Sequence, residues 1–473
     1  MTQRRPIVDA LVEFQRNRPT SFHVPGHKNG QLSGLPQELK AALLYDMTEL
    51  EGLDDLHAPK AAIKEAEALL AHAYGAEKSY FLVNGSTAGN LAMIHAVCRE
   101  GDRVIVQRNS HQSIFHALEL ARVRAIYVAP EWDETSKSAA AVSLSSVTSA
   151  LLEYPDAKAA VLTYPNYYGM GSSELTAVIE LCHEQSIPVL VDEAHGAHFT
   201  AGAPFPVSAL TCGADAVVQS AHKTLPAMTM GSYLHIQGEL VDEGAIRKYL
   251  RIFQSSSPSY PIMASLDDAR AYIQNYSASD KQEFLEKREH FVTSLKRIPL
   301  IEVVESTDPL KLLLRVEKCG GFQLKDALEK VGIYAELADP FQVLLILPLI
   351  KRGYAYPSAE ICSRIKEAVA SLSHQESVIP NFQPRQQNPV VVPELTFEEV
   401  DLSARKWVPY TQVAGRISAA MVTPYPPGIP LVVAGEKWTI DKVEVLADYV
   451  ASGAEIQGEH RLAQKLVLVI GSE

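Results

Sequence analysis

The sequence predicts an α/β fold in which a mostly parallel sheet forms a large domain, followed by smaller α+β domains. Two observations lead to this class. Between residues 74 and 233, short apolar segments alternate with segments of helical periodicity, an order typical of parallel strands joined by right-handed crossovers. The apolar segments also lack polar alternation, so both faces of the sheet are expected to be covered by helices.

A short helix and a loop are expected before the sheet. Ile7, Leu11 and Phe14 recur at helical spacing and predict a helix over residues 6–16. Residues 21–30 follow as a polar loop punctuated by proline and glycine. The apolar segments that predict strands are residues 79–83, 103–106, 125–128, 159–163, 188–192 and 216–219. Helices are expected between them at residues 88–97, 113–120 and 175–184.

The C-terminal half predicts a bridge and further domains. A long helical region over residues 262–295 is expected to lead to a smaller α+β unit. The segments that indicate this unit are residues 310–316, 323–331 and 341–349. Residues 381–393 are rich in proline, glutamine and asparagine and predict a linker to a last segment over residues 395–473.

Composition limits the partners and the compartment. The 473 residues carry a formal net charge of −13, which argues against nucleic acid and anionic membranes and suits a small cationic substrate. Five scattered cysteines without a C-x-x-C pair indicate reduced thiols in the cytoplasm. Residues 1–18 lack the apolar core of a signal peptide, and no apolar run is long enough to span a bilayer.

Lys223 is the most informative residue. It follows the apolar segment 216–219, within Ser220-Ala221-His222-Lys223, and is expected to open a loop. A lysine at the carboxyl end of a buried strand faces the crevice where open α/β sheets bind ligands. Burial favours the neutral amine, which can attack a carbonyl and form a Schiff base.

Three other positions follow predicted strands. Residues 84–87, Asn-Gly-Ser-Thr, could bind an anion at a helix N-terminus, although alone they are better explained as an ordinary N-cap. Asp192 could keep a pyridinium nitrogen protonated, cap a helix or bind a metal, but no third metal ligand has suitable spacing. His111 could stack on a planar ring or lie at the surface.

The joint pattern favours one ligand. In chain order, an anion loop, a histidine, an aspartate and a lysine each follow a strand of the same predicted sheet. These are the groups needed to hold the phosphate, ring face, ring nitrogen and aldehyde of pyridoxal 5′-phosphate (PLP). The sequence therefore predicts a PLP site and no metal.

Seven motifs carry a family resemblance. They are FHVPGHK at residues 22–28, DDLH at 54–57, NGST at 84–87, RNSH at 108–111, DEAHGAH at 192–198, SAHKT at 220–224 and PYPPG at 424–428. With these motifs the chain resembles, over nearly its whole length, the bacterial ornithine/lysine/arginine decarboxylase family of PLP enzymes with the aspartate-aminotransferase-like fold.

The resemblance implies a role for each matched residue. Lys223 would form the Schiff base, Asp192 would pair with the ring nitrogen and His111 would stack on the ring. His195 would lie near the phenolic oxygen or the substrate carboxylate. The remaining cofactor contacts would be Ser86, Thr87 and Ser220 on the phosphate and Ala194 beneath the ring. A serine of the run 255–260, taken as Ser256, would reach the phosphate of a neighbouring subunit, which predicts a homodimer with shared active sites.

The resemblance also implies a domain plan. A fold type I PLP-transferase domain is expected over residues 31–285, after an N-terminal helix and arm at 1–30. A small α+β domain is expected over residues 286–390, and a C-terminal decarboxylase domain over 391–473. Long family members carry an N-terminal receiver-like domain before the His-Val-Pro-Gly-His motif, whereas only a short helix precedes it here. We therefore expect the short form and a dimer or tetramer, not a decamer.

The expected activity is decarboxylation of a basic L-amino acid. Arginine or lysine, less so ornithine, would give carbon dioxide and a polyamine precursor, agmatine or cadaverine. Lys223 is the expected proton donor to Cα, with His222 and His195 as alternatives. Other possibilities are another fold type I PLP enzyme (an aminotransferase, lyase or aldolase) or a non-catalytic PLP-binding regulator. Acidic candidates for the distal cation of the substrate, or plain surface charges, are Glu51, Asp54, Asp55 and Glu436.

Overall fold

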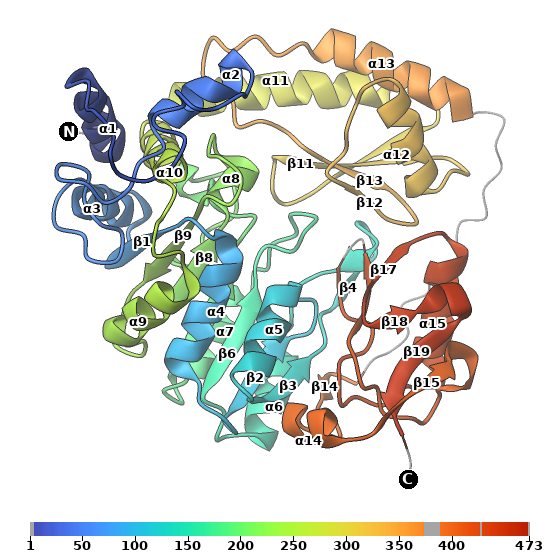
Figure 1. Ribbon diagram of the computed structural model, residues 1–473. Coiled ribbons are helices and arrows are strands. Elements are labelled where there is room, and N and C mark those ends of the chain that lie inside the picture. The colour runs from blue at the N-terminus through green and yellow to red at the C-terminus, as the bar shows by residue number, and fades with distance from the viewer. Residues whose placement is uncertain (1–3, 373–387, 426–427, 472–473) are drawn as a thin grey trace. The chain divides into compact units, whose positions relative to one another are not determined.

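The computed structural model describes residues 4–372, 388–425 and 428–471. The chain forms two compact units, each built from two stretches of sequence. The first unit comprises residues 1–97 and 182–277, and the second comprises residues 98–181 and 278–473. Figure 1 labels many of the elements of both units. The expected division into four domains remains a prediction.

The sheet of the first unit has the strand order β1-β9-β8-β7. Its strands are β1 (Lys78–Leu82), β7 (Val189–Asp192), β8 (Ala216–Gln219) and β9 (Ser232–Ile236). Three of them lie within one residue of the predicted segments. The sheet is mostly parallel, as expected: β7 and β8 are parallel, whereas β9, which was not predicted, lies between β1 and β8 and pairs antiparallel with both. Strand β9 escaped prediction because Ser232 and His235 interrupt its apolar pattern.

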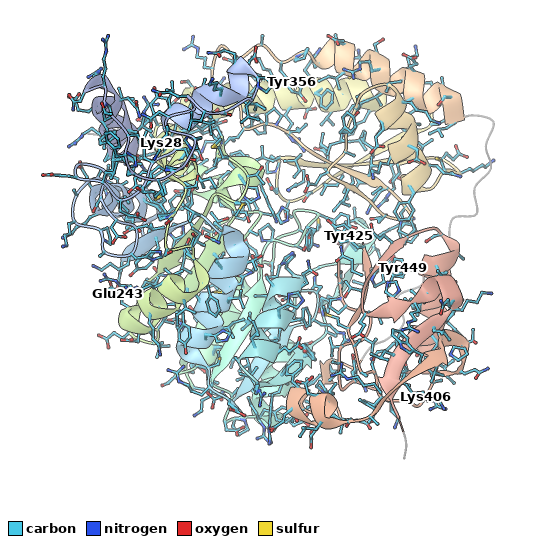
Figure 2. All side chains as sticks on the ribbon, in the orientation of Figure 1. Lys28, Glu243, Tyr356, Lys406, Tyr425 and Tyr449 are labelled. Atoms are coloured by element: carbon cyan, nitrogen blue, oxygen red, sulfur yellow. The ribbon has the colours of Figure 1, made fainter. Side chains whose placement is uncertain are left out.

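The first unit also contains helices, several of which pack on this sheet. They are α1 (Pro6–Arg16), α2 (Gln37–Lys40), η1 (Ala41–Leu44), α3 (Ala62–Tyr74), α4 (Gly85–Val97), η2 (Phe199–Ala201), α8 (Ala221–Thr224), α9 (Glu243–Phe253) and α10 (Tyr260–Gln274). The N-terminal helix has the predicted bounds. Helix α9 is tied to strand β1 because the Tyr80 hydroxyl donates to Glu243, labelled in Figure 2, at 3.1 Å.

Helix α4 packs closely on the sheet, and Gly89 makes this possible. A Cβ at Gly89 would lie 2.7 Å from Leu82 Cδ1 and 2.9 Å from Val218 Cγ2. The helix therefore approaches strands β1 and β8 to a distance that only glycine allows. The close approach brings the first turns of α4 near the ends of strands β1 and β8.

The second unit contains several smaller sheets. Strands β6 (Ala159–Thr163), β2 (Arg103–Gln107), β3 (Arg124–Val128) and β14 (Val390–Val391) lie in this order, with β2 parallel to β6 and β3, and β14 antiparallel to β3. A four-stranded sheet follows with the order β10-β11-β13-β12. Its strands are β10 (Ile301–Glu305), β11 (Lys311–Val316), β12 (Leu337–Ala338) and β13 (Val343–Ile346). The predicted small α+β unit is thus present.

The C-terminal segment has its own core around the buried Trp438. Its strands are β15 (Arg405–Pro409), β16 (Val422–Tyr425), β17 (Glu455–Gly458), β18 (His460–Arg461) and β19 (Leu466–Ile470). A short hairpin elsewhere in the unit pairs β4 (Trp132–Asp133) with β5 (Ser138–Ala139). The helices of the unit are α5 (Gln112–Leu120), α6 (Leu144–Glu153), α11 (Ala278–Lys296), α12 (Gly321–Lys330), α13 (Ser358–Leu372), α14 (Phe397–Leu402), η3 (Tyr410–Gln412), α15 (Ile440–Ala451) and η4 (Leu462–Gln464). Helix α7 (Leu175–His183) spans the chain boundary between the units.

Two expectations are corrected. The long helical region over residues 262–295 is two helices, α10 and α11, separated by residues 275–277. The predicted linker lies partly outside the described residues, but within it Val390–Val391 forms β14, because its backbone pairs with Tyr127 and Val128 of β3. None of the helices in the described part of the chain has the length and apolarity of a membrane span.

Candidate active site

Asp192 and Lys223 follow two neighbouring parallel strands. Asp192 is the last residue of β7, is buried and pairs in register with Val218 of β8. Lys223 lies just beyond the end of β8. It does not open a loop as expected but belongs to the short helix α8, for which Ser220 is the N-cap. Because β7 and β8 run the same way, their carboxyl ends place both side chains at one edge of the sheet.

The amine of Lys223 faces a buried histidine. Its Nζ lies 3.1 Å from Nε2 of His195, whose side chain is buried in the turn after β7. The other candidate, His222, donates from Nδ1 to the Gly231 carbonyl at 3.0 Å. The structure therefore brings His195 to Lys223, while His222 helps to anchor helix α8 to the loop before β9.

The carboxylate of Asp192 is oriented by two donors. Asn90 Nδ2 donates to Oδ2 at 2.9 Å, and the backbone N–H of Ala194 donates to Oδ1 at 3.1 Å. Asn90 is buried on α4 and was not predicted as a site residue. It lies four residues after Ser86, so both face the same side of the helix. That spacing was the available signal.

Serine hydroxyls gather at the N-terminus of α4. Ser86 Oγ lies 2.7 Å from Ser220 Oγ and 3.1 Å from Ser232 Oγ. The helix begins at Gly85, which has a φ of +78°, and Thr87 is exposed in the same turn. A helix N-terminus offers free N–H groups and the positive end of its dipole. Together with the hydroxyls, these groups can bind a phosphate. Ser232 was missed because it lies on the unpredicted strand β9.

The structure gives fewer contacts between the remaining predicted residues and the groups described above. The backbone carbonyl of Ala194 accepts from Ser220 N at 3.3 Å. Ser256 is exposed, and its neighbour Ser255 donates from its backbone N–H to Asn84 Oδ1 at 3.2 Å within the same unit. The reach of Ser256 to a partner subunit remains a prediction. His111 lies in the second unit as the N-cap of α5, so its stacking on a ring also remains a prediction.

A buried chain of hydrogen bonds lies behind the site. The carboxylate of Glu193 accepts from Ala209 N at 2.6 Å, from Ser208 Oγ at 2.8 Å and from Gln219 Nε2. Gln219 Oε1 in turn accepts from His235 Nε2 at 3.2 Å. Burial lowers the pKa of His235 to about 3 and raises that of Glu193 to about 7. The chain joins the ends of β7 and β8, next to Asp192 and Ser220.

Two of the acidic residues proposed to bind the substrate cation already bind groups within the protein. The Asp54 carboxylate accepts from the backbone N–H groups of Lys60 at 2.8 Å, Ala61 at 2.8 Å and Ile63 at 3.0 Å. Burial acts to raise the pKa of Asp54, but these donors hold it below its ordinary value. Glu436 is buried in the second unit, bound to Arg108 and Lys442. Both acids are therefore structural. Of the other two candidates, Asp55 accepts from the backbone N–H of His57 at 2.8 Å, and Glu51 is exposed.

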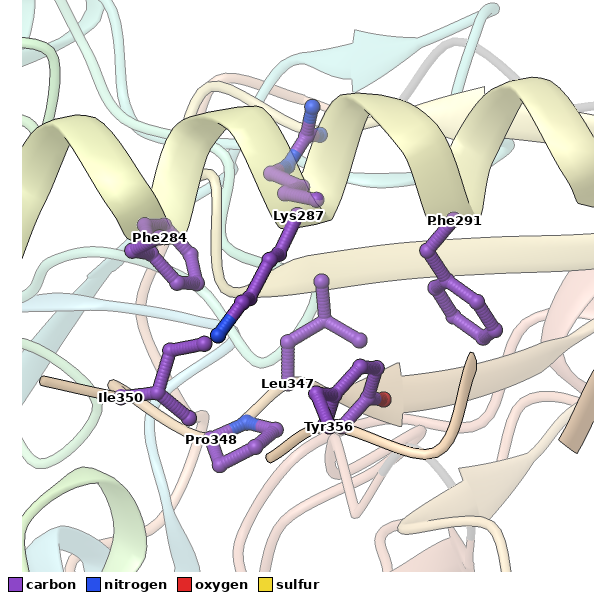
Figure 3. Close-up of a pocket in the computed structure, with 8 residues that line it drawn as sticks. Phe284, Lys287, Phe291, Leu347, Pro348, Ile350 and Tyr356 are labelled. Atoms are coloured by element: carbon purple, nitrogen blue, oxygen red, sulfur yellow. The ribbon is translucent and has the colours of Figure 1, made fainter. Parts of the chain in front are cut away.

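A small pocket in the second unit does not look like a site for a cationic amino acid. It lies between α11 and the segment around Tyr356, both visible in Figure 3. The residues that line it are Phe284, Lys287, Arg288, Phe291, Leu347, Pro348, Ile350 and Tyr356. The lining residues include no acidic side chain that could bind a cation. In the described ranges, no cluster of histidine, cysteine or acidic residues could hold a metal ion.

Comparisons with family models match most of the chain. Residues 5–314 match the model described as Orn/Lys/Arg decarboxylase, major domain. Residues 377–459 match the model described as Orn/Lys/Arg decarboxylase, C-terminal domain.

Two relatives are similar over almost their whole length, and a solved structure over most of its chain. The chain is 44% identical over 475 residues to the uncharacterized protein YaaO of Bacillus subtilis, covering 98% of each chain. It is 32% identical over 488 residues to an arginine decarboxylase of the same organism, covering 98% of this chain and 97% of the relative. The solved structure of lysine decarboxylase A from Pseudomonas aeruginosa superposes with a TM-score of 0.78 at 20% identity, covering 98% of this chain and 80% of that one. This last likeness shows the fold.

The buried Glu193 predicts a pH-dependent stability. Its pKa is raised from 4.5 to about 7 by burial, so the folded protein holds this proton more tightly than the unfolded chain. The contribution of Glu193 to stability is therefore greatest below pH 4.5 and is lost as the pH rises towards 7. Glu193→Gln removes this titration. The free energy of unfolding of the variant, relative to wild type, should rise between pH 5 and pH 8 by up to about 3 kcal/mol.

Urea unfolding at several pH values measures this difference, because all other groups titrate in both proteins. The control is Glu239→Gln at an exposed position of the same unit, which should show no such trend. A difference between wild type and Glu193→Gln that stays constant with pH would contradict the assignment.

Proposed function

The chain belongs to the ornithine/lysine/arginine decarboxylase family, and we propose that it decarboxylates arginine or lysine with pyridoxal 5′-phosphate, using Lys223 as its Schiff-base residue. The products would be carbon dioxide and agmatine or cadaverine, which are precursors of polyamines. The observation that carries the proposal is the approach of Lys223 to His195 beside the buried, oriented carboxylate of Asp192. Arginine is favoured over lysine because the relative at 32% identity is named an arginine decarboxylase.

The residues present fit the chemistry of this cofactor. Three hydroxyls and a helix N-terminus suit its phosphate, and the Asp192 carboxylate suits a protonated ring nitrogen. A primary amine beside them, that of Lys223, suits the aldehyde. When bound, the cofactor supplies an electron sink for the pair released from the Cα–carboxylate bond.

The side chains of this protein supply position and protons. Asp192 would keep the ring nitrogen of the bound cofactor protonated, and its two donors, Asn90 and the N–H of Ala194, keep the carboxylate in one orientation. The serine cluster around Ser86 fixes the phosphate end of the ligand. Lys223 is the group proposed to return a proton to Cα. His195, at 3.1 Å from its Nζ, is placed to exchange that proton with Lys223.

We further propose the assembly and the location. The exposed Ser256 would complete the active site of a second subunit, which makes the working enzyme a homodimer. Five cysteines without disulfide partners among the described residues agree with a cytoplasmic enzyme.

Lys223→Ala should reduce decarboxylation to background, because the Schiff base cannot form. The variant should also lose the visible absorbance that PLP shows when bound to a lysine. Activity is measured by release of carbon dioxide with arginine and with lysine. The control is Lys64→Ala at an exposed position of α3 in the same unit, which should behave as wild type. A Lys223→Ala protein that turns over at the wild-type rate would remove Lys223 from the mechanism.

Asp192→Asn should lower kcat by roughly 100- to 1,000-fold, because a neutral amide no longer stabilises the protonated ring nitrogen. Asn90→Ala should have the same sign but a smaller effect, of about 10-fold, because the carboxylate remains and loses one of its two orienting donors. Steady-state kinetics on both variants compare the effects. An Asn90 effect larger than that of Asp192 would show that the ring partner lies elsewhere.

The substrate is decided by parallel assays with arginine, lysine and ornithine. Amine products are identified by mass spectrometry, and the highest kcat/KM is expected with arginine. A keto acid in place of an amine would indicate an aminotransferase instead.

A further inference from the structure

We propose that Glu436 is a positioning residue for the active site, because it clamps Arg108 and thereby fixes the loop that presents His111. The loop connects β2 to α5 in the second unit, and Glu436 belongs to the C-terminal segment of the same unit. The proposal rests on the proposed function, in which His111 stacks on the cofactor ring.

The contact between Arg108 and Glu436 is a forked ion pair. Nη1 donates to Oε1 at 3.0 Å and Nη2 donates to Oε2 at 2.7 Å. Their side chains are 8% and 4% exposed. Nη2 also donates to the Leu431 carbonyl at 3.1 Å. Two parallel hydrogen bonds fix the direction of the guanidinium as well as its place.

Other groups of the C-terminal segment hold the Glu436 carboxylate that binds the Arg108 guanidinium. The backbone N–H of Val433 donates to Glu436 Oε2 at 3.1 Å, and Lys442 Nζ contacts Oε1. Burial acts to raise the pKa of Glu436, but the two cations hold it below its ordinary value, so the carboxylate is ionised. Burying such a group is costly, and an apolar pair of similar size often stabilises a protein as well or better. The ion pair is therefore better explained by the fixed position that it gives to Arg108 than by its contribution to stability.

The loop before His111 is held by contacts with four other parts of the unit. The backbone N–H of Arg108 donates to the Val128 carbonyl at 2.9 Å, and its side chain reaches the C-terminal segment. Asn109 Nδ2 donates to the Ala140 carbonyl at 2.8 Å, and Ser110 Oγ accepts from Thr163 Oγ1 at 2.9 Å. Of these anchors, that of Arg108 is the one supplied by the segment after residue 391.

His111 itself is oriented at the end of this clamp. Its Nδ1 accepts from the backbone N–H of Ser113 at 3.2 Å and lies 2.8 Å from Ser113 Oγ. Because Ser113 lies in the first turn of α5, the plane of the imidazole depends on how the loop positions the start of that helix. A displacement of Arg108, three residues earlier, would pass along a buried loop and tilt that plane. In such sites a misplacement of about 1 Å can lower the rate by up to about 100-fold.

The test compares Glu436→Gln in the wild-type and His111→Ala backgrounds. Glu436→Gln keeps the shape but removes the charge, and we expect kcat to fall by about 10-fold with little change in KM. The visible circular dichroism of bound PLP, which reports the orientation of the ring, should weaken in parallel. In the His111→Ala background the same change should have almost no further effect, because it acts through His111. Equal effects in both backgrounds would overturn the proposal.

A second pair of variants separates positioning from folding. Replacing Arg108, Glu436 and Lys442 together by Met removes the whole buried ion cluster without leaving an unpaired charge. This combined variant should regain the urea unfolding midpoint lost in Glu436→Gln without regaining kcat or the dichroism. Recovery of kcat together with stability would show a purely structural pair. If the combined variant does not fold, Arg108→Lys is tested instead, because lysine keeps the positive charge but cannot form the two parallel hydrogen bonds to Glu436. Unchanged kcat and dichroism in that variant would overturn the proposal.

The matched control is Arg103→Met. Arg103 lies at the other end of β2 and forms an exposed ion pair with Asp156 at 2.9 Å. This variant should leave kcat and the dichroism unchanged, and a loss equal to that of Glu436→Gln would show that any charge removed from β2 acts alike. The result for Lys223→Ala distinguishes a failure of the proposed function from a failure of the positioning role of Glu436. If that variant is inactive while Glu436→Gln is normal, the positioning role alone fails.

Discussion

The parallel pairing of β7 with β8 is the constraint on which the site depends. It aligns Asp192 with Val218, so the acid ends one strand while the helix that carries Lys223 begins just past the end of the other. A shift of this register by one residue would turn Asp192 to the opposite face of the sheet. Helix α4 then adds its serine hydroxyl and Asn90 from the side, at a separation that Gly89 allows. The candidate site is a consequence of how three elements of one unit pack.

Polar groups buried behind the site hold these strand ends together. Glu193, Gln219 and His235 form a continuous chain of hydrogen bonds across β7, β8 and β9. Each of these groups has a partner, which is the condition under which buried polar networks rigidify a structure. The cost is a carboxyl group whose pKa lies near neutrality. The ion pair of Arg108 with Glu436 has a comparable place in the second unit, where it joins the loop before His111 to the C-terminal segment.

Much of this arrangement could be predicted from the sequence. The strands that became β1, β2, β7 and β8 were predicted from short apolar runs, and the informative residues lie at or just after their carboxyl ends. Strand β9 was missed because its buried polar residues, Ser232 and His235, break that pattern. Asn90 carries no chemical signature on its own, since an amide inside a helix is uninformative until its partner is known. Its spacing from Ser86 was the one clue.

Long-range contacts were beyond prediction. Arg108 and Glu436 are 328 residues apart in the chain, and no local pattern connects them. Asp54 likewise resembled a surface acid until the structure showed its carboxylate bound to the backbone around Lys60 and Ile63. The family resemblance supplied the roles of matched residues, whereas the structure showed which acids are already committed.

Chemical trapping at the proposed lysine tests the central claim most directly. Wild-type protein saturated with PLP is reduced with borohydride, digested and mapped by mass spectrometry. The account predicts a stable pyridoxyl adduct on the peptide that contains Lys223, at about one per chain. An adduct on a different lysine, or none at all, would contradict it.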